Sequence, residues 1–185
     1  MGKHLISMLA CIALAVVLNS CLESRGSSRN CPEKFDTPEA MVEAALLGLD
    51  QMSVEEFSSM MESEEMFILL DVRTSAEHNA GYIPGSVLMP RGVLEFRIAN
   101  EAIWEDEGMY VPLKEDPIII YCKRGNRSAL AAASLKKMGY SNIKVITGGW
   151  LDWQTAYPEN VESNIDLSAG AGAEMISSSD SGGGC

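Results

Sequence analysis

Residues 117–138 read Pro-Ile-Ile-Ile-Tyr-Cys-Lys-Arg-Gly-Asn-Arg-Ser-Ala-Leu-Ala-Ala-Ala-Ser-Leu-Lys-Lys-Met, and this stretch decides the fold. Its apolar start, residues 117–121, is typical of a strand that is buried on both faces. Residues 128–138 have helix-forming side chains and are followed by Gly139, which predicts a helix that ends there. A strand that runs through a short loop into a helix is the repeating unit of an α/β sheet.

The same alternation of strands and helices extends outward on both sides of this stretch. Strands are predicted over residues 67–70, 86–89 and 143–147, and helices over 38–50, from Ser53 onward, over 93–99 and over 150–153. The helix at Ser53 begins with a capping box, because Glu56 follows three residues later. The pattern predicts one α/β domain with a central, mainly parallel sheet flanked by helices.

Chemistry in such sheets gathers where the strands end, which directs attention to Asp71 and Cys122. Three cations, Lys123, Arg124 and Arg127, follow the cysteine, and the loop then enters a helix. Backbone N–H groups at a helix start and nearby cations stabilise a thiolate, which is the nucleophilic form of cysteine. The loop therefore predicts a nucleophilic cysteine in a cup of hydrogen-bond donors.

The charge balance and the cysteine content of the chain limit the kinds of ligand that it can bind. The chain of 185 residues has 14 Lys and Arg against 26 Asp and Glu, a formal charge of −12. This balance argues against a surface that binds nucleic acid or an anionic lipid face, since both need clustered cations. The five cysteines show no C-x-x-C spacing, which leaves little for a zinc site, and we expect neither a metal nor an organic cofactor.

Five motifs occur in one order: Leu69-Leu70-Asp71-Val72-Arg73, Glu77, Gly81-Tyr82-Ile83-Pro84-Gly85-Ser86, Tyr121-Cys122-Lys123-Arg124-Gly125-Asn126-Arg127-Ser128 and Gly148-Gly149-Trp150-Leu151-Asp152-Trp153. On these motifs, the chain resembles the single-domain members of the rhodanese family over about residues 52–158. The resemblance implies a three-layer α/β domain and a thiosulfate-type sulfurtransferase. One departure is Tyr82, where relatives usually have histidine.

By this resemblance, Cys122 is the nucleophile that holds a sulfane sulfur as a persulfide. The implied substrate is a small sulfur-containing anion, and the acceptor is a thiol or another thiophile. Asp71 would lie at the neighbouring strand end, hydrogen-bonded to the loop. The remaining implied site residues are Lys123, Arg124, Gly125, Asn126 and Ser128 in the substrate-binding loop, Arg127 as a catalytic residue, and Arg73, Tyr82 and Trp150 at the pocket rim.

Structural alternatives stay open for several of these residues. Asp71 is equally well explained as a residue that satisfies the hydrogen-bonding groups at the end of a strand. Arg73 and Glu77 are four residues apart and are also explained by a local ion pair. His78 is better explained as a surface histidine than as a partner of Cys122. The three tryptophans are better explained as packing or rim residues than as part of a cofactor site; these are Trp104, Trp150 and Trp153.

Two other functions compete with sulfur transfer. A phosphatase or arsenate reductase also places a cysteine in a basic loop, and an inactive relative would only bind a partner. The phosphatase loop has five residues between its cysteine and arginine, whereas here four separate Cys122 from Arg127. The shorter loop favours a terminal sulfur over a tetrahedral phosphate, and the presence of Cys122 argues against an inactive module.

The two ends of the chain do not read as part of the fold. Residues 1–20 are predicted to be a secretory signal, and Leu18-Asn19-Ser20-Cys21 resembles the box in which bacterial lipoproteins are lipidated on cysteine. We expect a polar linker over 21–36, a leading helix over 37–51, the domain over 52–158 and a disordered tail over 159–185. These features predict an exported protein of the cell envelope or periplasm, tied to a membrane through lipid on Cys21.

Overall fold

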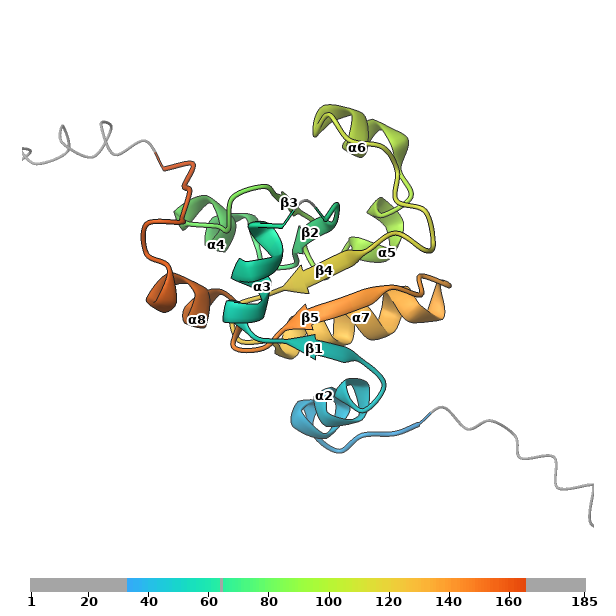
Figure 1. Ribbon diagram of the computed structural model, residues 1–185. Helices are drawn as coiled ribbons and strands as arrows, with labels where there is room; N and C mark the ends of the chain where they lie inside the picture. Colours follow the sequence, from blue (N-terminus) through green and yellow to red (C-terminus); the bar gives the residue numbers. More distant parts are fainter. Residues whose placement is uncertain (1–32, 64, 166–185) are drawn as a thin grey trace, which may run out of the picture. The chain divides into compact units, whose positions relative to one another are not determined.

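A computed structural model describes residues 33–63 and 65–165 (Figure 1). The chain divides into two units, residues 1–35 and residues 36–185, and the fold reported below is that of the second. Its elements are α2 (Pro38–Leu46), β1 (Asp50–Met52), α3 (Val54–Met61), β2 (Ile68–Asp71), α4 (Ser75–Ala80), β3 (Ser86–Leu88), α5 (Leu94–Arg97), α6 (Glu101–Asp106), β4 (Ile118–Tyr121), α7 (Asn126–Lys137), β5 (Ile143–Ile146) and α8 (Gly149–Ala156).

The strands form one five-stranded sheet in the order β1-β5-β4-β2-β3. Every neighbouring pair is parallel, so all carboxyl ends meet at one edge of the sheet. The predicted α/β fold is confirmed, and the sheet is entirely parallel. β4 lies in the centre, and its register pairs Tyr121 with Asp71 of β2. The segments that follow these two strands are therefore neighbours.

Two apolar clusters lie on the two faces of the sheet, because successive side chains of a strand point to opposite faces. Ile118, Ile120 and Cys122 pack on one face with residues of α5 and α7. Ile119 and Tyr121 pack on the other face with residues of α3 and α8. Figure 1 shows these helices on either side of the strands, which gives the three layers.

Helix starts follow the expected sequence signals. Ser53 and Glu56 form the predicted capping box of α3. α7 begins at Asn126, two residues before the predicted start, because Gly125 caps it in the left-handed conformation with φ 98°. That conformation favours glycine, since it has no Cβ to collide with the backbone. The α7 N-terminus therefore opens directly from the cysteine loop.

The structure differs most from the predictions at one helix end, at two short helices and in the tail. The helix predicted over 38–50 ends at Leu46, and residues 50–52 form β1 instead, paired with β5. α4 and α6 were not predicted at all. Residues 159–165 were assigned to a disordered tail, yet Glu162 and Tyr82 exchange backbone hydrogen bonds and Asn164 bonds to Asn79. These contacts hold the segment against the end of α4.

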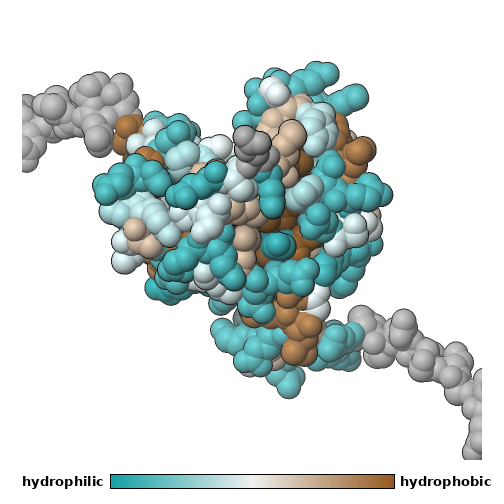
Figure 2. Space-filling model, viewed as in Figure 1, coloured by the Kyte–Doolittle hydropathy of each residue, from teal (hydrophilic) through white to brown (hydrophobic). Residues whose placement is uncertain are grey.

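The predicted signal peptide, the lipidation site Cys21 and the tail from residue 166 lie outside the described residues. Within those residues, no helix is both long and apolar enough to cross a membrane. The face seen in Figure 2 is mostly hydrophilic, with hydrophobic patches over α2 and beside α6. Leu47 and Phe96 are among the large hydrophobic side chains that stay exposed.

Candidate active site

Cys122 follows β4 directly and lies at the carboxyl edge of the sheet. The residue is only 1% exposed, and it is the one free cysteine in the part of the chain that the structure describes. Its Sγ accepts a hydrogen bond from the backbone N of Gly125 at 3.2 Å, and the hydroxyl of Ser128 lies 3.7 Å away. The sulfur is thus buried under the loop of residues 122–128, the cup, in which Gly125 N–H donates to it.

The start of α8 holds this loop from outside. The backbone N of Trp150 donates to the carbonyl of Cys122 at 2.8 Å, and that of Leu151 donates to Lys123 at 3.2 Å. Gly149 makes the close approach possible, because a Cβ there would lie 2.2 Å from the carbonyl oxygen of Cys122. Sequence reasoning missed this support, although the Gly148-Gly149 pair after a strand is the signal that marks it.

A second support lies inside the loop. The hydroxyl of Ser128 donates to the carbonyl of Gly125 at 2.8 Å, and the backbone N of Ala129 donates to the same oxygen at 3.0 Å. Ser128 is fully buried. The loop is therefore tied to the first turn of α7 as well as to α8, which fixes its curvature around the sulfur.

Arg127 forms an ion pair with Glu77 of α4. Its Nη1 and Nη2 each lie 2.7 Å from one carboxylate oxygen of Glu77. The hydrogen bonds from Arg127, together with those from Thr74, lower the pKa of Glu77 to about 2, so that it stays ionised. The alternative of a local ion pair between Arg73 and Glu77 does not hold, since Arg73 reaches only the backbone carbonyl of Glu77, at 3.2 Å.

Asp71 is the centre of a buried polar cluster. Its carboxylate accepts hydrogen bonds from Arg73 Nη2 at 2.6 Å, from the Tyr121 hydroxyl at 2.9 Å and from His78 Nδ1 at 2.9 Å. Although burial acts to raise it, the hydrogen bonds from His78 and Arg73 and the charge of Arg73 hold the pKa of Asp71 below its usual value. Arg73 and His78 are 2% and 6% exposed, so the cluster is closed to solvent.

This cluster lies on the other face of the sheet from the cysteine. Tyr121 packs on the α3 and α8 face and bonds to Asp71, whereas Cys122 packs on the α7 face. We expected Asp71 to be hydrogen-bonded to the cysteine loop. Instead, among the described residues, its carboxylate accepts hydrogen bonds from Arg73, His78 and Tyr121. The Asp71 carboxylate therefore makes no hydrogen bond to Cys122 in the described part of the chain.

The residues predicted at the pocket rim are mostly interior. The guanidinium of Arg73 lies over the rings of Trp150, at 4.6 Å, and Tyr121, at 5.4 Å. Trp150 itself is 9% exposed. The ring of Tyr82 stacks on His78 with centroids 4.1 Å apart, so His78 is a packed residue and its interpretation as a surface histidine was wrong.

The exposed part of the loop carries free cations. Lys123, Arg124 and Asn126 are exposed, and none of the salt bridges within residues 33–63 and 65–165 involves Lys123 or Arg124. Two cationic side chains are thus available to an anion that approaches the buried sulfur from solvent. This arrangement suits a donor whose charged end stays outside while one atom reaches Sγ.

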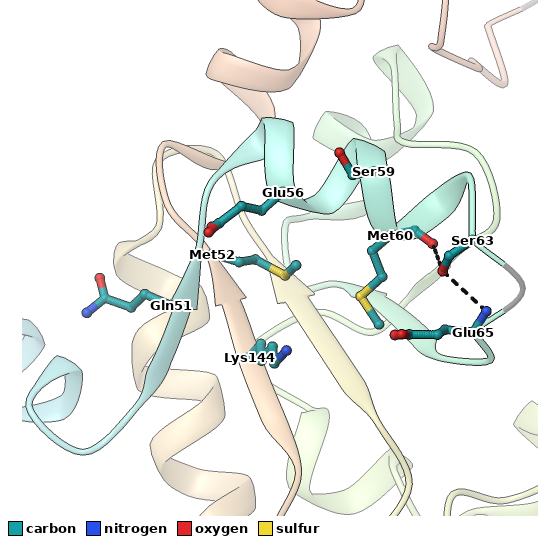
Figure 3. A pocket seen from close by; sticks show the side chains of 8 residues that line it. All are labelled: Gln51, Met52, Glu56, Ser59, Met60, Ser63, Glu65 and Lys144. Carbon is teal, nitrogen blue, oxygen red and sulfur yellow. Dashed lines mark hydrogen bonds between the residues drawn. The ribbon is translucent and has the colours of Figure 1, made fainter.

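A separate pocket of about 370 Å³ lies beside β1 and β5 (Figure 3). Its lining consists of Gln51, Met52, Glu56, Ser59, Met60, Ser63, Glu65 and Lys144. It contains none of the predicted site residues, so we do not place the reaction there. In the described part of the chain, no group of three or more His, Cys, Asp and Glu side chains is arranged to hold a metal ion.

Comparison with known proteins places the chain in a family. The Rhodanese-like domain model matches residues 53–156. A mitochondrial protein of Schizosaccharomyces pombe, provisionally named a thiosulfate sulfurtransferase, is 38% identical over 46% of this chain and 62% of its own length. The chain therefore spans less than two thirds of that relative.

Two further matches cover nearly whole proteins. Thiosulfate sulfurtransferase GlpE of Pseudoalteromonas translucida is 27% identical over 63% of this chain and 99% of its own. A Rhodopseudomonas palustris structure of unknown function, described as a possible tyrosine phosphatase, is 28% identical with a TM-score of 0.56 over 68% of this chain and 95% of that one. With the family model covering more than half of its length, the chain belongs to the rhodanese-like domain family.

Proposed function

We propose that the protein is a sulfurtransferase that moves a sulfane sulfur from an anionic donor, such as thiosulfate, to a thiophilic acceptor. The observation that carries the proposal is the buried Cys122 Sγ, which accepts a hydrogen bond from Gly125 N in a loop that exposes Lys123 and Arg124. Two relatives are named as thiosulfate sulfurtransferases, one of them provisionally, and these names point to the same substrate class.

The first half of the reaction loads the cysteine. The Cys122 thiolate attacks the outer sulfur of thiosulfate, forming a new S–S bond as the S–S bond of the donor breaks. The electron pair of the broken bond leaves with sulfite. Backbone N–H groups of the loop stabilise the negative charge near Sγ, and the exposed cations stabilise the departing sulfite.

The second half unloads it. A thiophile, cyanide in an assay or a thiol in the cell, attacks the outer sulfur of the Cys122 persulfide. A bond forms between acceptor and sulfur, and the persulfide S–S bond breaks to return the thiolate. The two halves balance without an external oxidant, reductant, metal or organic cofactor.

Phosphate-ester hydrolysis is the competing function, suggested by the description of the R. palustris protein. It requires an arginine whose forked nitrogens bind two oxygens of the tetrahedral phosphate. Both terminal nitrogens of Arg127 are held by Glu77. The occupied fork, together with the short loop, favours sulfur transfer.

The decisive experiment is thiocyanate formation from thiosulfate and cyanide by the purified chain. We expect steady turnover that is lost in Cys122→Ser, because the serine hydroxyl cannot form a persulfide, and urea denaturation checks that this variant is folded. An absence of thiocyanate combined with rapid hydrolysis of an aryl phosphate would overturn the assignment. An absence of both activities would instead support a partner-binding module.

The place of the reaction is proposed from the sequence alone. The predicted signal and the cysteine at position 21 would put the domain in the cell envelope on a lipid anchor. Mass spectrometry of the protein from membranes of cells that express the full chain tests this. Lipid on Cys21 supports the proposal, and a chain that retains residues 1–20 without lipid contradicts it.

A further inference from the structure

Arg127 belongs to the loop around the reacting sulfur, but its guanidinium is bound elsewhere. It directly precedes Ser128, whose hydroxyl lies 3.7 Å from Cys122 Sγ. The pKa of Arg127 is raised, first by its hydrogen bonds to Glu77. Its two terminal nitrogens point to Glu77, each 2.7 Å from a carboxylate oxygen. A cation beside the cup is thus already neutralised by a residue of the protein.

Glu77 is held in place independently of Arg127. Thr74 caps α4, and its backbone N and hydroxyl donate to Glu77 Oε2 at 3.1 and 3.0 Å. The backbone N of Glu77 donates back to the Thr74 hydroxyl at 3.3 Å, which completes a capping box. The carboxylate is therefore preorganised by its own helix, and it presents a fixed negative charge to Arg127.

We propose that Glu77 is a specificity-determining residue: it withholds Arg127 from the substrate, so that the cup admits a terminal sulfur and rejects tetrahedral oxyanions. The charged end of the donor is then left to Lys123 and Arg124 at the exposed rim. Phosphate, arsenate and sulfate need a convergent pair of donors at the sulfur, and the fork that would supply it is occupied. This inference rests on the proposed sulfurtransferase site and names what that site excludes.

Neutralising Glu77 should therefore increase the binding of oxyanions in the cup. Glutamine at this position keeps an oxygen for the Thr74 cap, since capping boxes accept either residue. Its amide nitrogen replaces Oε1 and cannot accept from Arg127 Nη2, while the capping oxygen still faces Nη1 without a negative charge. The guanidinium therefore loses one bond and its ion-pair partner, and we expect it to turn toward the cup. The probe is inorganic phosphate, which carries no transferable sulfur and so reports oxyanion binding alone.

The test measures inhibition of thiosulfate–cyanide transfer by phosphate in wild type and Glu77→Gln. We expect the inhibition constant to fall about tenfold, the change that one released charge-assisted contact provides. A matched control is Glu95→Gln, which neutralises the Arg91–Glu95 pair, whose side chains are 30% exposed, close to the 36% and 29% of Arg127 and Glu77. This control should leave the inhibition constant unchanged.

The double variant Glu77→Gln with Arg127→Gln shows whether the gain comes from the guanidinium. It removes one charge of each sign, and we expect its phosphate inhibition constant to return to the wild-type value. A double variant about tenfold weaker than wild type would show that Arg127 already binds oxyanions and would overturn the inference. An unchanged constant in Glu77→Gln would overturn it as well.

A second readout keeps this test separate from the proposed activity. Phosphate bound in the cup should slow the alkylation of Cys122 by iodoacetamide, whether or not the protein transfers sulfur. We expect phosphate to protect Glu77→Gln at about tenfold lower concentration than wild type. If this protection pattern is seen but no thiocyanate forms, only the proposed function is contradicted. If phosphate protects both proteins equally, only the inference is contradicted.

Discussion

Two neighbouring strands, β2 and β4, end at the same edge of the sheet, and the segments that follow them use charge in opposite ways. At the end of β2, Asp71 and Arg73 form a buried pair with exposed fractions of 0% and 2%. After β4, Lys123 and Arg124 are exposed around a buried Cys122. The first segment has its charges satisfied inside the protein, while the second presents them to solvent.

A charged motif at a strand end is therefore not by itself a reaction site. The Asp71 cluster has its hydrogen bonds filled by Arg73, His78 and Tyr121, and Trp150 covers it. The cysteine loop has a sulfur with one backbone donor and two cations without a partner in the described chain. We therefore assign stability to the first segment and chemistry to the second, and the following variants test that division.

The largest effect on stability is expected for Asp71→Ala. Removing the carboxylate leaves the buried Arg73 charge without a partner, which costs about 3–5 kcal/mol in the free energy of unfolding. Urea denaturation measures the loss, and Glu105→Ala, an exposed helix position, should stay within about 0.5 kcal/mol. Transfer activity per folded molecule should remain near wild type. A stable Asp71→Ala protein without activity would place Asp71 in the catalytic machinery instead.

The next effect is expected at Gly149, where the second segment is supported. An alanine Cβ would lie 2.2 Å from the Cys122 carbonyl at a φ of +61°, so we expect Gly149→Ala to cost about 2–3 kcal/mol and to lower kcat. Gly108→Ala is the control, because it has a similar φ of +68° but no atom within 4 Å of the new Cβ. If both variants lost stability equally, backbone strain alone would explain the result and the loop support would not.

A smaller effect is expected for the exposed cations. Lys123→Ala should raise the KM for thiosulfate about fivefold at low salt, which corresponds to about 1 kcal/mol, with a smaller change in kcat. The rise should shrink as ionic strength increases, because the lysine is exposed and its charge is screened. Lys137→Ala, at the other end of α7, should leave the KM unchanged. Equal KM values in Lys123→Ala and Lys137→Ala would show that Lys123 does not contribute to binding of the sulfur donor.

The smallest effect is a pH dependence carried by Glu77. Its pKa is lowered from 4.5 to about 2 in the folded protein, first by the hydrogen bonds from Arg127. A lowered folded pKa stabilises the protein above pH 4.5, and the contribution is lost as pH falls toward 2. The stability difference between wild type and Glu77→Gln should therefore shrink over that range in urea titrations. A difference that stays constant from pH 6 to pH 2 would contradict the ion pair.

Much of the fold is readable from the sequence, because β2 and β4 contain continuous apolar runs and β5 is apolar except for Lys144, each between helical segments. β1 was missed because it has only three residues and follows a helix whose apolar spacing continues into it. Its strand character comes from backbone pairing with β5, a partner more than ninety residues away. The short helices α4 and α6 have six residues each, too few for a periodic signal.

The sequence predicted those parts of the site whose residues are close together in the chain. It did not predict the contacts between segments that are distant in the chain. Cys122, the glycine turn and the helix start lie within a few residues of one another, so their proximity follows from the sequence. The ion pair of Glu77 with Arg127 spans fifty residues, and local spacing suggested Arg73 in its place. The face on which Asp71 lies follows from its pairing with Tyr121 across β2 and β4, which a single sequence does not reveal.

The central claim is that Cys122 carries the transferred sulfur, and a mass measurement tests it most directly. The purified chain is incubated with thiosulfate, freed of excess donor and digested, and the peptide containing Cys122 is weighed. We predict a gain of one sulfur atom on this peptide, absent from Cys122→Ser and removed by cyanide with release of thiocyanate. An unmodified Cys122 peptide from a protein that still forms thiocyanate would contradict the account.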